Sequence, residues 1–266
     1  MEQTASKHSD TEKGRRSIAR TCEPLLYLPK IKSELLGPFV VNGEDYSLPR
    51  FTYRCPKSSD PIRLGIFAAI HGDEPAGALG VVRFLLGLAQ EPELATDYQI
   101  DAYPICNPTG FEDNARVSRG GRDLNREFWK NSDEPEVQIL ENELRTRHFQ
   151  GIIQIHADDT SDGIYGFVRG HTLTENLLRP ALCEAGKILP RNVNATIDGF
   201  AARDGIIYKA YEGILAAPVE IEPTPFEIIF ETPHAAPMDL QVEAILAALR
   251  AIMEEYRKLI SFAQDI

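Results

Sequence analysis

Cysteine is scarce in this 266-residue sequence, which holds four cysteines and a single tryptophan. The four thiols stand far apart in the chain and form no C-x-x-C pair: they are Cys22, Cys55, Cys106 and Cys183. This spacing excludes a disulfide-stapled scaffold as the main interpretation. We therefore expect reduced thiols in a cytoplasmic protein.

Long apolar runs and an excess of basic residues are also missing. No stretch approaches the roughly 18 apolar residues that a membrane span needs, and residues 1–17 lack the apolar centre of a signal peptide. The 28 basic residues against 40 acidic ones give a net charge of −12. Nucleic acids and anionic membranes are bound by basic surfaces, so we expect neither as a partner.

Hydrophobic residues make up 43% of the chain, enough for a sizeable core in one large domain. Residues 1–20 are polar and charged, which predicts a flexible N-terminal arm. We expect residues 21–266 to form a single domain.

Strand and helix patterns alternate along that domain. Strands with an Asn42-Gly43 hairpin turn are expected within residues 35–53. Further strands are predicted at residues 63–70, 98–106, 151–156 and 226–231, and helices at residues 75–88, 136–148, 172–187 and 239–262. This order predicts an α/β fold, with a mixed, mostly parallel twisted sheet, helices on both faces and an N-terminal hairpin.

The segment His71-Gly72-Asp73-Glu74 directly follows the first strand that is apolar throughout. Ligands in open α/β sheets bind outside the carboxyl ends of the strands, where a glycine turn would aim both side chains into one crevice. An imidazole and a carboxylate suit zinc, which then needs a third ligand. His156 closes the next apolar strand and is preferred for that role, with His234 as the serious rival.

Four arginines gather in one stretch of this acidic chain, within residues 107–128. A solvated loop, a phosphate-binding loop and recognition of a substrate carboxylate all remain open from the residues alone. The net charge and the absence of a P-loop lysine pattern weaken the phosphate interpretation. An arginine fork grips a carboxylate with two hydrogen bonds.

With this segment the chain resembles the zinc carboxypeptidases, the carboxypeptidase A-like metallopeptidases. The motifs that carry the resemblance occur in the family's order over about residues 62–235: His71-x-x-Glu74, Asn107-Pro-x-Gly110, Asp123-Leu-Asn-Arg126 with Phe128, His156, and the strand that ends at Glu231. Each motif is weak alone, and their joint occurrence is specific.

The resemblance implies a role for each matched residue. His71, Glu74 and His156 would hold one Zn²⁺ per chain, and Glu231 would be the catalytic carboxylate. In the arginine segment, Asn125 and Arg126 would bind the substrate carboxylate, and Arg116 (or else Arg119) would stabilise the oxyanion. The family also has a tyrosine over the pocket, which would be Tyr208 or Tyr211.

The placement of Arg116 looks most like the small bacterial members that act on murein peptides. His-Ala-Asp-Asp after the third ligand strand and Thr-Pro after Glu231 look like the succinylglutamate desuccinylase and aspartoacylase branch. We therefore expect a zinc hydrolase that cuts an amide bond beside a free carboxylate, most simply a carboxypeptidase acting on small peptides. An N-acyl-amino-acid deacylase and a catalytically silent binding domain are the alternatives.

Overall fold

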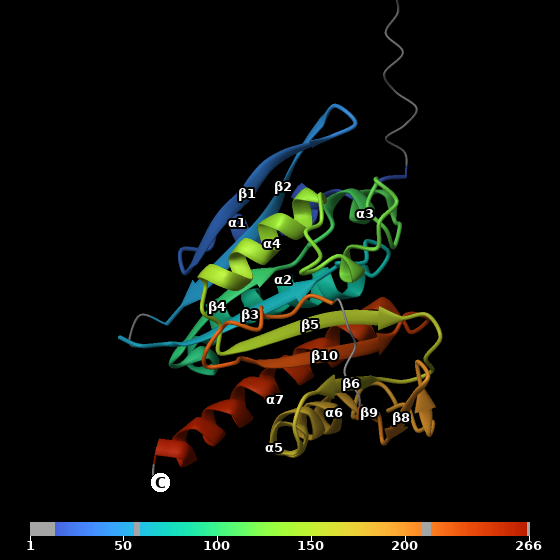
Figure 1. The fold of residues 1–266 in the computed structure, drawn as a ribbon. Coiled ribbons are helices and arrows are strands. Elements are labelled where there is room, and N and C mark those ends of the chain that lie inside the picture. Colours follow the sequence, from blue (N-terminus) through green and yellow to red (C-terminus); the bar gives the residue numbers. More distant parts are fainter. Residues whose placement is uncertain (1–13, 56–58, 209–213, 265–266) are drawn as a thin grey trace, which may run out of the picture.

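The computed structural model describes residues 14–55, 59–208 and 214–264. Within these ranges, ten strands form one sheet in the order β1-β2-β4-β3-β5-β10-β6-β9-β8-β7 (Figure 1). The strands are β1 (Ile31–Val41), β2 (Glu44–Arg54), β3 (Ile62–Ala68), β4 (Tyr98–Tyr103), β5 (Gly151–Asp158), β6 (Tyr165–Val168), β7 (Thr196–Ile197), β8 (Phe200–Arg203), β9 (Ile206–Ile207) and β10 (Phe226–Pro233).

Parallel pairs β4–β3, β3–β5 and β5–β10 make the centre of the sheet. β2 and β6 pair antiparallel to the two outer strands of this parallel centre. Asn42 and Gly43 connect β1 to β2 with φ of 52° and 81°, the conformation that an Asn-Gly hairpin turn requires. The predicted mixed α/β sheet with an N-terminal hairpin is thereby confirmed.

Helices cover both faces of the sheet (Figure 1). They are α1 (Ile18–Leu26), α2 (Pro75–Gln90), α3 (Pro108–Asp113), α4 (Pro135–Thr146), α5 (His171–Leu173), α6 (Arg179–Ala185) and α7 (Met238–Gln264). Buried side chains of α1, α2, α6 and α7 share one core with the sheet, whereas α4 packs in a second core on the other face. A π-helical segment, Thr174–Leu178, joins α5 to α6.

The predicted arm of residues 1–20 extends too far. Its first 13 residues lie outside the described ranges, but α1 begins at Ile18, with the Ser17 hydroxyl accepting a hydrogen bond from the Arg20 backbone. The buried side chains of Cys22 and Leu25 dock this helix on the core. The sequence signal was missed because only one face of one short helix is apolar.

All four cysteines are free: three are buried, and Cys183 is exposed. Within the described ranges, the chain contains no helix with both the length and the apolar character needed to cross a membrane.

Candidate metal centre and active site

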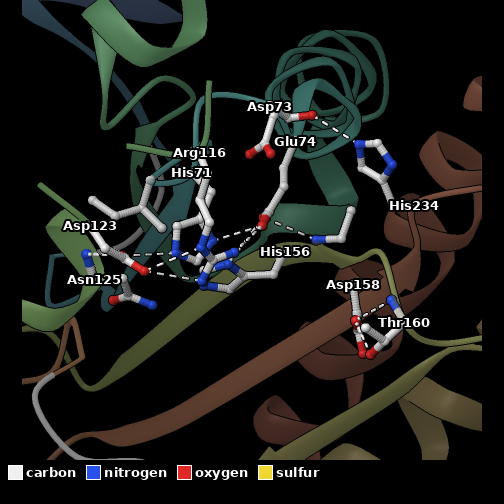
Figure 2. Close-up of polar contacts among 12 residues, drawn as sticks. His71, Asp73, Glu74, Arg116, Asp123, Asn125, His156, Asp158, Thr160 and His234 are labelled. Atoms are coloured by element: carbon white, nitrogen blue, oxygen red, sulfur yellow. Dashed lines mark hydrogen bonds and ion pairs between the residues drawn. The ribbon is translucent and has the colours of Figure 1, made fainter. Parts of the chain in front are cut away.

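Three buried side chains from two neighbouring strand ends converge at the carboxyl edge of the sheet (Figure 2). His71 lies just beyond β3, Glu74 immediately precedes α2, and His156 belongs to β5, which pairs in parallel with β3. Their possible ligand atoms all lie within 4.8 Å of one another. The His71–Glu74–His156 group can therefore hold a metal ion.

Glu74 is the centre of this group. Its Oε1 lies 2.7 Å from Nδ1 of His71, and its Oε2 lies 3.2 Å from Nδ1 of His156. The backbone N–H of Ala157 also donates to Oε2, at 3.0 Å. Burial alone would raise the pKa of Glu74, but the two imidazoles outweigh it and lower that pKa to about 2. The carboxylate is therefore ionised, as a metal ligand must be.

Asp123 holds the first imidazole from its other side. Its Oδ1 lies 3.2 Å from Nε2 of His71, and its Oδ2 lies 3.2 Å from Nη2 of Arg116. Burial opposes ionisation of Asp123, but His71 and Arg116 together keep its pKa below the usual value. Carboxylates in this position fix the tautomer and orientation of a ligand histidine. Sequence reasoning quoted Asp123 within the Asp-Leu-Asn-Arg motif and gave it no role.

Glu231 stands opposite His156 in the register of β10 on β5 and lines the same cavity. Burial raises its pKa well above the ordinary value, and the nearby carboxylates of Glu74, Asp158 and Asp198 raise it further. A carboxylate with a raised pKa is a stronger base than an ordinary carboxylate.

Some residues of the arginine segment line the cavity, and others contact the rest of the fold. Arg116, Asn125 and Arg126 line the cavity. Asn125 accepts a 2.9 Å hydrogen bond from the Leu215 backbone through Oδ1, so its amide nitrogen is the atom left to meet a substrate.

Arg119, the alternative oxyanion residue, does not line that cavity. Its guanidinium is bonded to Asp113 at 2.7 Å, to Glu44 at 2.7 Å and to the Tyr46 hydroxyl. These contacts tie the arginine segment to the N-terminal hairpin.

The two tyrosine candidates fall elsewhere. Tyr208 is 57% exposed and lines a separate hollow with Arg169 and His171. Tyr211 lies outside the described residues. His234 lines the central cavity, but its Nε2 donates a 3.1 Å hydrogen bond to the Asp73 carbonyl (Figure 2).

One wall of the cavity is acidic. Asp158, Asp159 and Asp198 line it beside Tyr165, whose hydroxyl donates to Oδ2 of Asp158 at 2.9 Å. Figure 2 shows Asp158 on the side of the metal-binding group away from Asp123 and Asn125. The cavity thus has two walls, one that carries arginines and one that carries carboxylates.

The segment that carries this site matches a known family model. Residues 61–186 match the family model described as the succinylglutamate desuccinylase/aspartoacylase catalytic domain. This range includes His71, Glu74 and His156. No curated protein sequence gives a significant match.

Solved structures share the fold. A candidate metallopeptidase from Shewanella amazonensis SB2B is 24% identical, with a TM-score of 0.72 over 89% of each chain. A metallo-carboxypeptidase from Burkholderia cenocepacia is 19% identical, with a TM-score of 0.69 over 91% of this chain and 68% of that one. A metallo-carboxypeptidase from Pseudomonas aeruginosa, in complex with (2-guanidinoethylmercapto)succinic acid, is 19% identical, with a TM-score of 0.66 over the same shares. Residues 61–186 thus match the succinylglutamate desuccinylase/aspartoacylase catalytic domain, and the whole chain is similar in fold to these metallopeptidase and metallo-carboxypeptidase structures.

Proposed function

We propose that this protein is a zinc-dependent hydrolase that cleaves an amide bond next to a free carboxylate, as a metallocarboxypeptidase acting on small peptides. The observation that carries the proposal is the buried His71–Glu74–His156 group, with Glu231 and Arg116 lining the same cavity. Small molecules, and neither nucleic acid nor membrane, are the proposed partners of this acidic protein.

The donor set fits zinc. Two imidazoles and one carboxylate form a known catalytic zinc ligand set, which leaves a coordination position for water or substrate. Asp123 supplies the carboxylate partner that ligand histidines usually have. We propose one Zn²⁺ per chain, held by His71, Glu74 and His156. When bound, zinc supplies Lewis acidity and lowers the pKa of its water.

The residues of the cavity have distinct roles in the proposed reaction. Glu231 takes a proton from the attacking water and delivers it to the leaving amine, which its raised pKa favours. Arg116 meets the negative charge that develops on the carbonyl oxygen. The amide nitrogen of Asn125 and the guanidinium of Arg126 bind the substrate carboxylate, which sets its distance from the scissile bond.

Hydrolysis of N-acyl amino acids is the second candidate, because residues 61–186 match the desuccinylase/aspartoacylase model. The acidic wall argues for peptides. A succinyl group would bring a second carboxylate into a cavity that Asp158, Asp159 and Asp198 already line. Like charges at short range destabilise each other, whereas a neutral peptide chain meets no such repulsion.

The experiment is a hydrolysis screen of the zinc-loaded protein with dipeptides, murein-type peptides and N-acyl amino acids. We expect release of a C-terminal residue from at least one peptide. Cleavage of N-succinyl or N-acetyl amino acids alone would replace the carboxypeptidase assignment by the deacylase. A protein that retains no zinc and cleaves none of these substrates would be a binding domain.

A further inference from the structure

The loop of residues 71–74 carries two of the three proposed ligands. Each of the backbone carbonyls of residues 71–73 accepts a hydrogen bond. The His71 carbonyl accepts a 3.2 Å hydrogen bond from the Glu74 backbone, within the turn itself. The Gly72 carbonyl accepts from Nη1 of Arg16 at 2.7 Å, and the Asp73 carbonyl accepts from Nε2 of His234 at 3.1 Å. These two donors come from opposite ends of the chain, before α1 and after β10.

The side chains of His71 and Glu74 are held by Asp123 and by the Ala157 backbone, whereas the Gly72 and Asp73 peptides between them contact other groups. The glycine of this loop lies backbone to backbone against the next loop, where a Cβ on Gly72 would come within 1.9 Å of the Gly110 carbonyl carbon. Glu74, at the start of α2, makes no side-chain capping bond, and Pro75 has no N–H to donate. The Arg16 and His234 side chains therefore add two long-range hydrogen bonds that hold the Gly72 and Asp73 peptides.

Both donors are bonded to other parts of the fold. The Arg16 guanidinium also bonds Oδ1 of Asn114 and lies 5.4 Å from the centre of the Phe111 ring. Its backbone N–H donates to the Glu112 carbonyl at 3.0 Å. Arg16 is thus fixed on α3 and on the residue that follows it, and reaches from there to the loop.

His234 is fixed through its own backbone. Its N–H donates to the Asp158 carbonyl at 2.9 Å, and its carbonyl accepts from Nε2 of Gln241 at 3.1 Å. The ring nitrogen that faces the Asp73 carbonyl must carry a proton, because a carbonyl only accepts. That nitrogen is consequently used as a donor to the loop and not as a metal ligand.

We propose that Arg16 and His234 are positioning residues that brace the metal-binding loop from two sides and set the geometry of His71 and Glu74. The N-terminal segment before α1 then contributes, through Arg16, to the geometry of the metal centre. The inference rests on the metal site of the proposed function, but not on the choice between peptide and N-acyl substrates.

The test measures the rate at which the zinc-loaded protein releases zinc to an excess of chelator. We expect Arg16→Ala and His234→Ala each to release zinc about 10-fold faster, the scale seen when outer contacts of ligands are lost. Arg16→Lys and His234→Gln keep an N–H donor and should recover part of the loss. Two exposed positions, Arg20→Ala and His171→Ala, are the matched controls and should release zinc at the wild-type rate.

Each other outcome has a defined meaning. Wild-type release rates in folded Arg16→Ala and His234→Ala would overturn the brace and leave the zinc site intact. Complete zinc loss in His234→Ala without recovery in His234→Gln would make His234 a ligand and overturn its role here. If an alanine variant fails to fold, Arg16→Gln and His234→Phe take its place under the same criteria. A wild-type protein that binds no zinc would overturn the proposed function and the brace with it.

Discussion

Asp123 and His71 form a pair in which the carboxylate approaches the imidazole on the side away from Glu74. Oδ1 of Asp123 lies 3.2 Å from Nε2, while Oε1 of Glu74 lies 2.7 Å from Nδ1. With a metal ion bound, Nε2 would donate to Asp123 and Nδ1 would keep its lone pair toward the ion. Asp123 would then select the tautomer of His71 that metal binding needs.

Removal of that carboxylate should weaken the metal site without removing a ligand. We expect Asp123→Ala to lower zinc affinity by about 10- to 100-fold, as is typical for groups that orient a ligand histidine. Asp123→Asn keeps a hydrogen-bond acceptor and should lose less. Competition with a chromogenic chelator measures both. Asp162→Asn, at an exposed position, is the control, and equal affinities in all four proteins would refute the role of Asp123.

The ligand set itself makes a second prediction. His156→Ala removes one of three donors, so elemental analysis after purification should show strongly reduced zinc. His234→Ala should still bind zinc, because His234 lies outside the group of ligand atoms. Full occupancy in His156→Ala would show that the third ligand is another residue.

Glu231 is expected to act on the water and not to hold the metal. Glu231→Gln keeps the shape of the side chain and removes its basicity. We predict retained zinc and a turnover reduced by at least about 10²-fold, the usual contribution of a general base. The measurement is kcat on the best substrate of the screen, together with zinc content, and near-normal kcat would remove Glu231 from the mechanism.

The parts of this molecule that the sequence predicted best are those with a strong local pattern. The apolar runs that became β3, β5 and β10 place His71, His156 and Glu231 at strand ends, and parallel pairing brings those ends together. The Asn42-Gly43 turn was equally clear, because few other residue pairs tolerate two positive φ angles.

What the sequence did not predict depends on contacts between distant residues. Arg16 contacts Gly72 across 56 positions, and no local pattern marks that pair. Arg119 and Arg116 stand three residues apart in one segment, yet one is bonded to the hairpin and the other faces the cavity. Only the tertiary fold distinguishes such neighbours.

Glu136 gives a prediction for stability against pH. This residue lies in the first turn of α4, is 1% exposed, and neither carboxylate oxygen has a hydrogen-bond partner among the described residues. Burial, reinforced by the charge of Glu134, raises its pKa to about 7.

The raised pKa of Glu136 makes the stability of the protein depend on pH. The folded protein holds the Glu136 proton more tightly than the unfolded chain does. The contribution of this proton to the free energy of unfolding is therefore fully present below pH ~4.5 and is lost as pH rises through about 7. The difference between the ordinary pKa of a glutamate and a pKa of about 7 corresponds to about 3 kcal/mol in the free energy of unfolding. Glu136→Gln should therefore be more stable than wild type at pH 8 and similar at pH 4.5, as measured by urea unfolding. The exposed Glu23→Gln should show no such pH-dependent gain, and a Glu136→Gln gain independent of pH would contradict the assignment.

The substrate carboxylate provides the last prediction. Arg126 lines the cavity, where its Nη1 donates to the Asn125 backbone carbonyl at 2.8 Å, so the guanidinium is held beside Asn125. Amidation of the substrate carboxylate should abolish hydrolysis, because an unpaired charged group in the complex costs about 2–5 kcal/mol. Arg126→Ala should lower kcat/KM for the substrate with a free carboxylate by a factor that corresponds to a similar free energy. It should also reduce the ratio of kcat/KM between the free and the amidated substrate. Arg122→Ala serves as the control, since Arg122 is exposed and does not line the cavity. If Arg126→Ala discriminated between the two substrates as strongly as wild type, the carboxylate would be bound elsewhere, whereas the zinc site would stand.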